Sequence, residues 1–373
     1  MVSIEDVTEA LENTRVTISG VSFAGKSLKL DSENDAKPVV DAINDCADLQ
    51  YLNLKQFLGN ALVTAGARLT ELDLSDNAFG PIGVEGLASL LRSSSCYGLE
   101  ELRLNNNGLG IGGGKLLAKA LLDCYECSKS EGKPLALKVF IAGRNRLEND
   151  GAKALAEVFN TIGTLEEIAM PQNGIYHIGI SALSDAFRNN KNLQILNLND
   201  NTIGPTGSKA IADILPVLQN LKEINFGDCL LKNDGAKHLA IGLNNCMKLE
   251  SLTLGFNEIK KDGALELIAA LANKSQLKAL VLDGNNFGSD GKEAVRKKMM
   301  EIGKLNALGS LNDDESADSE DEEDTEEEQY QDDDGDDSEE IETKNESLED
   351  EKLYSCRIIA IISLEMMWRY SEI

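Results

Sequence analysis

A nine-position pattern recurs through the middle of this 373-residue chain. It has the form L-x-x-L-x-L-x-x-N, with other apolar residues at some of the leucine positions. Its copies begin at residues 69, 99, 137, 165, 193, 221, 249 and 277, so every step from 137 onward is 28 residues. Units of this kind pack mainly on their neighbours. The chain is therefore predicted to fold as a stack of repeats rather than around one central core.

The pattern also predicts the geometry within each repeat. Its apolar positions belong to a short strand, and the closing Asn turns inward to bond backbone groups where the chain leaves that strand. Such groups would otherwise be buried and unpaired, at a cost of about 1–3 kcal/mol each. The predicted column of inward residues is Asn77, Asn107, Asn145, Asn173, Asn201, Cys229, Asn257 and Asn285, in which cysteine is an accepted substitute.

The second half of each repeat has helical spacing of its apolar residues, for example Ala152, Leu155 and Phe159. Repeats with room for a full helix are of the long type found in ribonuclease inhibitor. We therefore predict an α/β leucine-rich-repeat solenoid with a concave parallel sheet and convex helices. The step from 99 to 137 is longer, and its polar excess near 127–136 is predicted to be a surface loop.

Composition divides the chain into four predicted parts. They are a capping unit (1–48), the repeat domain (49–305), a disordered acidic tail (306–352) and a C-terminal extension (353–373). The net charge is −28, and residues 313–351 alone hold 24 Asp or Glu and one Lys. A segment of that composition cannot bury a core. The acidic balance argues against nucleic-acid binding and favours a basic protein partner.

Several other classes of protein are disfavoured. The seven cysteines are irregularly spaced and the first ten residues are acidic rather than apolar, so reduced thiols in the cytoplasm are expected. Cys124 and Cys127 form a lone pair without nearby histidine, and no metal site is predicted. The apolar run at 358–364 is too short for a membrane span, which needs about 20 residues. No G-x-x-x-x-G-K-[ST] loop is present, so the chain is not expected to hydrolyse nucleotides itself.

Longer segments resemble one family in detail. They are VSFAGKSLKL, LTELDLSDNAFGP, LRLNNNGLGIGGGK, GRNRLENDGA and LEEIAMPQNGI, in this order and followed by the acidic tail. They resemble the Ran GTPase-activating proteins over about residues 16–340. The resemblance implies a protein that accelerates GTP hydrolysis by Ran in nucleocytoplasmic transport, in the cytoplasm and at the cytoplasmic face of the nuclear envelope. It also implies an activator rather than an enzyme.

The resemblance implies the following partners and site. GTP and Mg²⁺ are bound by the GTP form of Ran, so no cofactor is expected here, and a Ran-binding protein can join the complex. The family inserts no arginine finger. By its motif, Asn106 helps to position the catalytic Gln of the GTPase. The predicted partner-binding residues are Asp76, Asn105, Arg144, Arg146, Gln172, Asp200 and Asp228.

The register of the repeats separates the three consecutive asparagines. Asn107 belongs to the buried column, Asn106 should be exposed on a ridge beside the sheet, and Asn105 should be similar but less constrained. The acidic ridge residues Asp200 and Asp228 suit basic side chains on the partner. For any one ridge residue, a merely solvated loop position is the alternative.

One departure from the family concerns the first repeat. A strand is expected at 49–54, yet the next pattern begins at Leu69, and more than one repeat period of the family is missing between them. We expect reduced activator activity as a consequence. Two alternatives remain: a leucine-rich-repeat binding scaffold with little activator activity, and an inhibitor of a basic enzyme, which rests on analogy of fold alone.

Overall fold

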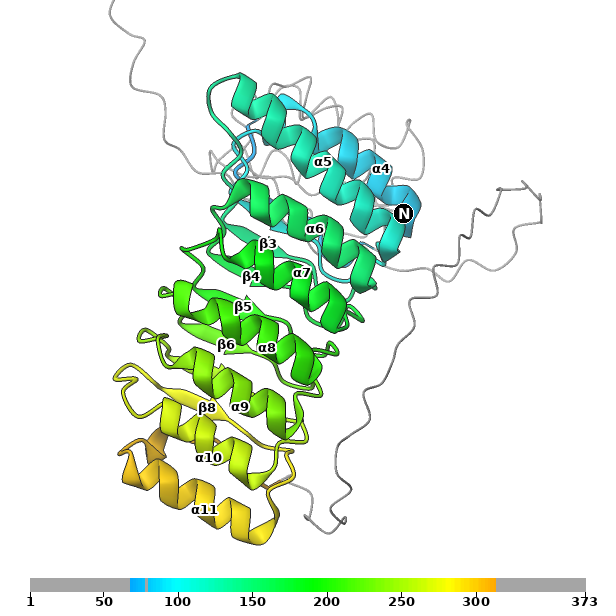
Figure 1. Ribbon diagram of the computed structural model, residues 1–373. Coiled ribbons are helices and arrows are strands. Elements are labelled where there is room, and N and C mark those ends of the chain that lie inside the picture. The colour runs from blue at the N-terminus through cyan, green and yellow to red at the C-terminus, as the bar shows by residue number, and fades with distance from the viewer. Residues whose placement is uncertain (1–67, 78–79, 313–373) are drawn as a thin grey trace, which may run out of the picture. The chain divides into compact units, whose positions relative to one another are not determined.

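The computed structural model describes residues 68–77 and 80–312. The expectations for residues 1–67 and 313–373, including the capping unit, the strand at 49–54 and the C-terminal extension, lie outside the described residues. Within the described part, eight strands form one parallel sheet in chain order, and each strand is followed by a helix (Figure 1). The predicted α/β leucine-rich-repeat solenoid is confirmed.

The strands are three residues long each. They are β1 (Glu71–Asp73), β2 (Glu101–Arg103), β3 (Val139–Ile141), β4 (Glu167–Ala169), β5 (Ile195–Asn197), β6 (Glu223–Asn225), β7 (Ser251–Thr253) and β8 (Ala279–Val281). The helices that follow them are α4 (Gly80–Leu91), α5 (Gly110–Ser130), α6 (Glu148–Ile162), α7 (His177–Phe187), α8 (Gly204–Ile214), α9 (Lys232–Leu243), α10 (Lys261–Ala270) and α11 (Gly288–Glu301). Short 3₁₀ turns lie at Ser94–Cys96, Leu215–Val217 and Leu305–Ala307.

The strands pair without any shift in register. The central residue of each strand faces that of the next, as in Leu102 with Phe140 and Leu196 with Ile224. These central side chains are buried, whereas the flanking residues are mostly half exposed on the other face of the sheet. A 28-residue spacing thus places chemically equivalent positions in rows that cross the whole sheet.

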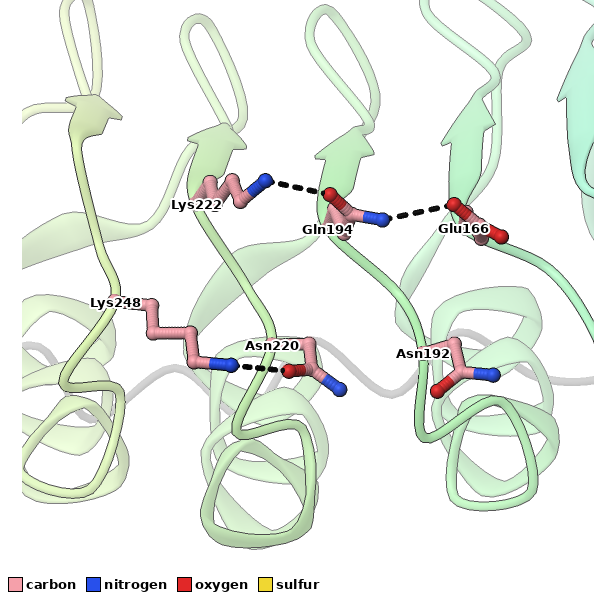
Figure 2. Close-up of a pocket in the computed structure, with 6 residues that line it drawn as sticks. All are labelled: Glu166, Asn192, Gln194, Asn220, Lys222 and Lys248. Carbon is pink, nitrogen blue, oxygen red and sulfur yellow. Dashed lines mark hydrogen bonds between the residues drawn. The ribbon is translucent and has the colours of Figure 1, made fainter.

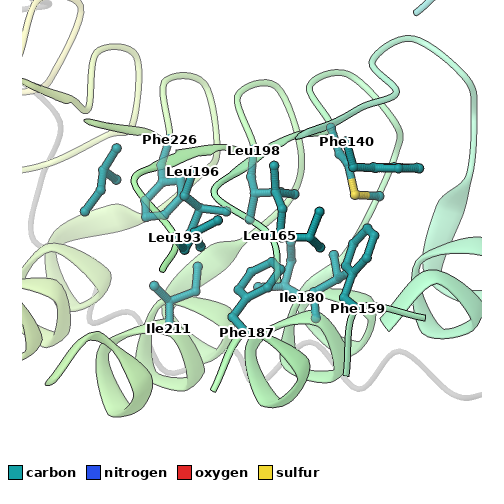
Figure 3. Close-up of a cluster of buried hydrophobic side chains, with 14 of the residues drawn as sticks. Phe140, Phe159, Leu165, Ile180, Phe187, Leu193, Leu196, Leu198, Ile211 and Phe226 are labelled. Carbon is teal, nitrogen blue, oxygen red and sulfur yellow. The ribbon is translucent and has the colours of Figure 1, made fainter. Parts of the chain in front are cut away.

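The core lies between the sheet and the helices. Each helix packs on the helices of the neighbouring repeats. Figure 3 shows how side chains from strands and helices meet there, including Phe140, Phe159 and Phe187. The rings of Phe140 and Phe159 meet edge to face with centroids 5.1 Å apart. Fully burying side chains of this size contributes about 1.5–3 kcal/mol each, which is why the apolar pattern determines the stack.

The predicted column of asparagines forms a continuous hydrogen-bonded ladder over most of its length. At Asn173, for example, Oδ1 accepts the backbone N–H of Asn145 at 3.0 Å. Its Nδ2 donates to the carbonyls of Ala142 and Met170 at 2.9 and 3.1 Å. Each such side chain therefore joins two repeats. We call the column Asn77, Asn107, Asn145, Asn173, Asn201, Cys229, Asn257 and Asn285 the rungs.

Cys229 fills its rung only in part. Its Sγ donates to the carbonyls of Leu198 and Gly227, each at 3.3 Å. Burial raises the pKa of this thiol to about 12, against the opposing effect of nearby backbone amides, so it keeps its proton. A thiol has no amide oxygen, and the strong acceptor that the other rungs offer to the preceding repeat is missing at this one.

The long second repeat differs from the prediction. We expected a loop at 127–136, but α5 continues to Ser130, so the first part of this segment is helical. Lys129 supports the extra turn by pairing with Glu126 and lying over the ring of Tyr125. The chain then returns through residues 131–138, where the Leu135 N–H donates to Ser128 Oγ at 2.8 Å.

The last repeat also extends beyond the predicted boundary. Residues 306–312 were expected to belong to the acidic tail, but they continue the fold. Leu308 pairs with Leu280 of β8, and the N–H of Gly309 donates to the Leu280 carbonyl at 2.9 Å. Leu311 is buried. These apolar residues cover the edge strand, so the acidic composition begins after the fold has closed.

Candidate functional site

A row of residues lies directly before the rungs, where the chain leaves each strand. We call this row the ridge, and its members are Asp76, Asn106, Arg144, Gln172, Asp200, Asp228, Phe256 and Gly284. The backbone N–H of Asn106 donates to the carbonyl of Gly143 at 2.8 Å, and that of Arg144 donates to Pro171 at 2.9 Å. The same bond recurs along the row, so neighbouring ridge residues are spaced about 5 Å apart, as in a sheet.

The ridge has an unusual backbone conformation. All eight members have positive φ, from 53° at Asn106 to 74° at Gly284. This left-handed region costs most residues about 1–2 kcal/mol, and it is tolerated best by Gly, Asn and Asp. Conformation therefore accounts for Asn and Asp on the ridge. It does not account for Arg144, Gln172 or Phe256, whose residue types need another explanation.

Asn106 and Asn107 have opposite environments, as predicted. Asn107 is fully buried, and its Nδ2 donates to the carbonyls of Leu74 and Leu104 at 2.9 and 3.0 Å. Asn106 is exposed, and its Nδ2 donates to Asp76 Oδ1 at 3.0 Å. This bond holds the amide in one orientation. The exposure of Asn106 on the ridge is confirmed, and its role in catalysis stays a prediction.

Asn105 is more constrained than we expected. Its Oδ1 accepts the N–H of Gly143 at 2.7 Å, and its own N–H donates to Ser75 Oγ at 3.2 Å. A side chain on Gly143 would collide with Asn105 and with Pro171. The expectation of a loosely held residue is wrong, because Asn105 links three repeats at the point where Asn106 is presented.

Arg144 and Arg146 are both exposed and both left-handed, with φ of 59° and 55°. At the place of Arg146, the two neighbouring repeats have glycines with positive φ, Gly108 and Gly174. Neither guanidinium takes part in an ion pair within residues 68–77 and 80–312. Both cations can therefore reach a partner, and neither is explained by the local fold.

The remaining predicted residues continue along the ridge. Gln172 and Asp228 are exposed and Asp200 is partly buried. Among the residues that the structure describes, neither carboxylate is in an ion pair. The structure thus places six of the predicted residues in one row: Asp76, Asn106, Arg144, Gln172, Asp200 and Asp228. Asn105 lies one residue before Asn106 of this row, and Arg146 lies two residues after Arg144.

The sheet face carries a group of charges that our sequence prediction missed. Arg103 pairs with Glu101 at 2.7 Å on the half-exposed face of β2. Burial raises the pKa of Glu167 in β4, with Arg103 opposing the shift, and burial together with Glu101 raises the pKa of Glu71 in β1. The signal was present in the outward strand positions, where acidic residues recur beside the ridge.

A shallow polar pocket of about 420 Å³ lies at the other edge of the sheet. Its lining residues lie shortly before the strands in the chain, whereas the ridge residues follow the strands (Figure 2). They are Glu166, Asn192, Gln194, Asn220, Lys222 and Lys248. Lys222 Nζ donates to Gln194 Oε1 at 2.7 Å, and Gln194 Nε2 donates to Glu166 Oε2 at 2.8 Å. These bonds link adjacent repeats. No predicted site residue contributes to this pocket.

The part of the chain that the structure describes shows neither a metal-binding cluster nor a membrane-spanning helix. No cluster of three or more His, Cys, Asp or Glu side chains there is arranged to hold a metal ion. Cys124 is buried, which raises its pKa to about 12, whereas Cys127 is exposed. None of the described helices has both the length and the apolar character needed to cross a membrane.

Similarity to known proteins agrees with this architecture. The family model described as "Leucine Rich repeat" matches residues 69–88, 189–212 and 245–267. With the fold and the ladder, this match makes the chain a leucine-rich-repeat protein.

The relatives are more specific. Ran GTPase-activating protein 1 of Xenopus laevis is 47% identical over 215 residues, which is 46% of this chain and 37% of that protein. Ran GTPase-activating protein of Drosophila melanogaster is 40% identical, covering 42% and 34%. Ran GTPase-activating protein 2 of Caenorhabditis elegans is 42% identical, covering 41% and 21%.

Over the matched repeats, the chain is similar to Ran GTPase-activating proteins of three animals, which confirms the resemblance predicted from the motifs. The matched part spans about a third of the length of the first two relatives and a fifth of the third.

Proposed function

We propose that this protein accelerates GTP hydrolysis by the small GTPase Ran, and that it does so through the ridge. The observation that carries the proposal is the Asn106 side chain, exposed on the ridge and held by Asp76 at 3.0 Å. The proposal is supported by relatives that are named Ran GTPase-activating proteins.

The proposed mechanism is one of positioning. Asp76 Oδ1 accepts a hydrogen bond from Nδ2 of Asn106. Because the amide nitrogen is engaged in this way, Oδ1 of Asn106 is directed to the partner as an acceptor. It would accept a hydrogen bond from the side-chain amide of the catalytic Gln of the GTPase, whose carbonyl orients the attacking water. Fixing such a group matters because a misplacement of about 1 Å can cost about 100-fold in rate. This protein contributes no nucleotide, metal or cofactor; GTP and Mg²⁺ belong to the partner.

Arg144 and Arg146 have a different proposed role. Both are exposed cations that could pair with acidic groups on the GTPase. An arginine finger instead stabilises the charge on the transferred phosphoryl group and is worth about 10³–10⁵-fold in rate. We propose binding without that contribution. Arg144→Ala and Arg146→Ala should therefore raise the concentration needed for half-maximal acceleration. The saturated rate should stay within about threefold of the original, which is far less than the loss expected on removing an arginine finger.

The proposed setting is the cytoplasm, including the cytoplasmic face of the nuclear envelope, where the GTP form of Ran would be the substrate complex. A Ran-binding protein is a proposed additional partner.

The second candidate function is that of a scaffold that binds Ran with little acceleration of its GTP hydrolysis. It is favoured by one observation: only 14 residues separate the expected strand at 49–54 from Leu69, where the next repeat pattern begins.

One assay tests both candidates. Ran loaded with GTP is mixed with increasing concentrations of the full chain, and single-turnover phosphate release is followed beside a binding titration. The proposal predicts a saturable acceleration of hydrolysis. Binding without acceleration would favour the scaffold, and absence of both would contradict the proposal.

A further inference from the structure

Phe256 is the least expected member of the ridge. Its side chain is 57% exposed although it is aromatic, and its φ is 57°. The ridge residue before it is Asp228 and the one after it is Gly284, both of which tolerate this conformation. An exposed ring gains nothing from the core, and its backbone is strained. Strained backbone is common at ligand-binding positions, which makes an exposed aromatic residue in this conformation a candidate for binding.

The ring of Phe256 packs against Gly284 of the neighbouring repeat. A Cβ placed on Gly284 would lie 2.5 Å from Cε1 and 2.8 Å from Cγ of Phe256. Only glycine can therefore occupy position 284 while the ring stays where it is. The backbone N–H of Phe256 also donates to the Asp283 carbonyl at 2.9 Å. The ring thus lies against Gly284 on one side, and its remaining surface faces solvent.

The charges beside the ring define what it could bind. Asp228 and Asp200 occupy the ridge in the two preceding repeats, about 5 and 10 Å away by strand spacing. Neither carboxylate is in an ion pair within the described ranges. A ring face attracts a guanidinium or ammonium group, and carboxylates bind the same groups by charge-assisted hydrogen bonds. Together, the three side chains suit a basic segment that carries more than one cation.

We infer that Phe256, seated on Gly284, forms with Asp228 and Asp200 a docking site for a basic segment of the partner GTPase. The inference rests on the proposed function, and it adds a residue that the family motif did not indicate. Five steps along the ridge separate Phe256 from Asn106, which is roughly 25 Å by strand spacing. A site at that distance stabilises the complex and does not touch the reacting groups.

The test separates association from chemistry. Phe256→Asn keeps a residue that accepts the left-handed backbone and removes the ring. In single-turnover hydrolysis by GTP-loaded Ran, we expect the half-saturating concentration of the full chain to rise about 10- to 50-fold, as for a central aromatic anchor. The saturated rate should stay within about twofold, because a contact made equally before and during the reaction affects binding alone.

Glu258→Asn is the matched control. Glu258 is exposed and has φ of 56°, two residues from Phe256, but it is not on the ridge. At high salt, which screens the effect of its lost charge, it should leave both the half-saturating concentration and the saturated rate unchanged. Thermal unfolding should show that both variants are at least as stable as the original chain, since asparagine relieves the left-handed backbone. Asp228→Asn should weaken association mainly at low salt, because salt screens exposed charges.

The outcomes distinguish this inference from the function beneath it. If the original chain accelerates hydrolysis and Phe256→Asn has the same half-saturating concentration, the docking site is refuted and the proposed function stands. A lower saturated rate with unchanged half-saturation also refutes it. If the original chain neither binds Ran nor accelerates its hydrolysis, the proposed function fails and the docking site fails with it.

Discussion

The rungs and the ridge are adjacent in sequence, yet they differ in almost every other respect. Rungs are nearly uniform in residue type, almost all are buried, and they bond to the backbone of neighbouring repeats. Ridge residues range from Arg144 to Phe256 and are mostly exposed. Both rows are constrained by the same turn. The rungs use it to satisfy buried backbone groups, whereas the ridge uses it to present side chains along one line.

Structural and functional asparagines differ in whether the fold alone accounts for their contacts. Asn107 is explained entirely by the ladder. Asn106 is compatible with its left-handed backbone, but its bond to Asp76 is not needed by the turn, because other ridge positions have no equivalent bond between two side chains. Residues that the local conformation disfavours, such as Arg144, point more strongly to a function than residues that it favours.

The largest expected effect is on stability, at a rung. Asn173→Ala would leave the Asn145 N–H and the carbonyls of Ala142 and Met170 without their partner. At about 1–3 kcal/mol for each buried group left unsatisfied, we expect a loss of about 3 kcal/mol or more. Equilibrium unfolding in urea measures it. Gln172→Gly, one residue earlier on the ridge, should leave the free energy of unfolding unchanged or higher. Equal losses in the two variants would erase the distinction between the rows.

The next effect has opposite signs for stability and binding. Arg146→Gly replaces a strained residue by the one found at this place in both neighbouring repeats, so the free energy of unfolding should rise by about 1 kcal/mol. Binding to Ran should weaken several-fold if Arg146 contacts the partner. Glu148→Gly also removes a left-handed residue, with φ of 52°, and should stabilise the fold without a change in affinity. Unchanged affinity for Arg146→Gly would remove it from the site.

A gain in stability alone is expected at the irregular rung. Cys229→Asn supplies the missing amide oxygen for the preceding repeat, which should raise the free energy of unfolding by about 1 kcal/mol, the usual contribution of one hydrogen bond. Chemical denaturation measures the change. A loss of stability would show that the site is shaped for a thiol and that the ladder does not limit stability there.

The smallest effect concerns the charges on the sheet face. Burial raises the pKa values of Glu71 and Glu167 in the folded state. The folded chain therefore keeps protons that the unfolded chain has lost, and the contribution of these groups to stability increases as pH falls through the folded pKa values. NMR titration should show both carboxyls titrating above their ordinary range, and Arg103→Gln should raise the pKa of Glu167 further. Ordinary values would indicate a more solvated face.

The sequence predicted the stack well because its information is periodic. One register places the strands, the buried central residues and the rungs, and all follow from apolar spacing and one polar position. The ends of the long second repeat were harder to predict. A polar segment such as 127–130 can extend a helix as readily as form a loop, and the neighbouring repeat decides between them.

The ridge could be predicted as a row, but its details could not. The bond between Asn106 and Asp76 joins residues 30 positions apart, and no local pattern requires it. The left-handed backbone at Arg144 and Arg146 could not be predicted from residue type, because arginine has no preference for this conformation. Phe256 occupies the ridge position of its own repeat, but its contact with Gly284 depends on the stacking of two repeats. Contacts between repeats, rather than within them, therefore determine the details of the ridge that the periodic pattern does not predict.

The most direct test of the account is the saturated single-turnover rate of GTP hydrolysis by Ran with Asn106→Gly beside the original chain. Glycine accepts the φ of 53° at this position, so the fold and the unfolding temperature should change little. We predict a fall of about 100-fold in the saturated rate, the scale of lost positioning, with binding largely retained. A saturated rate equal to that of the original chain would contradict it.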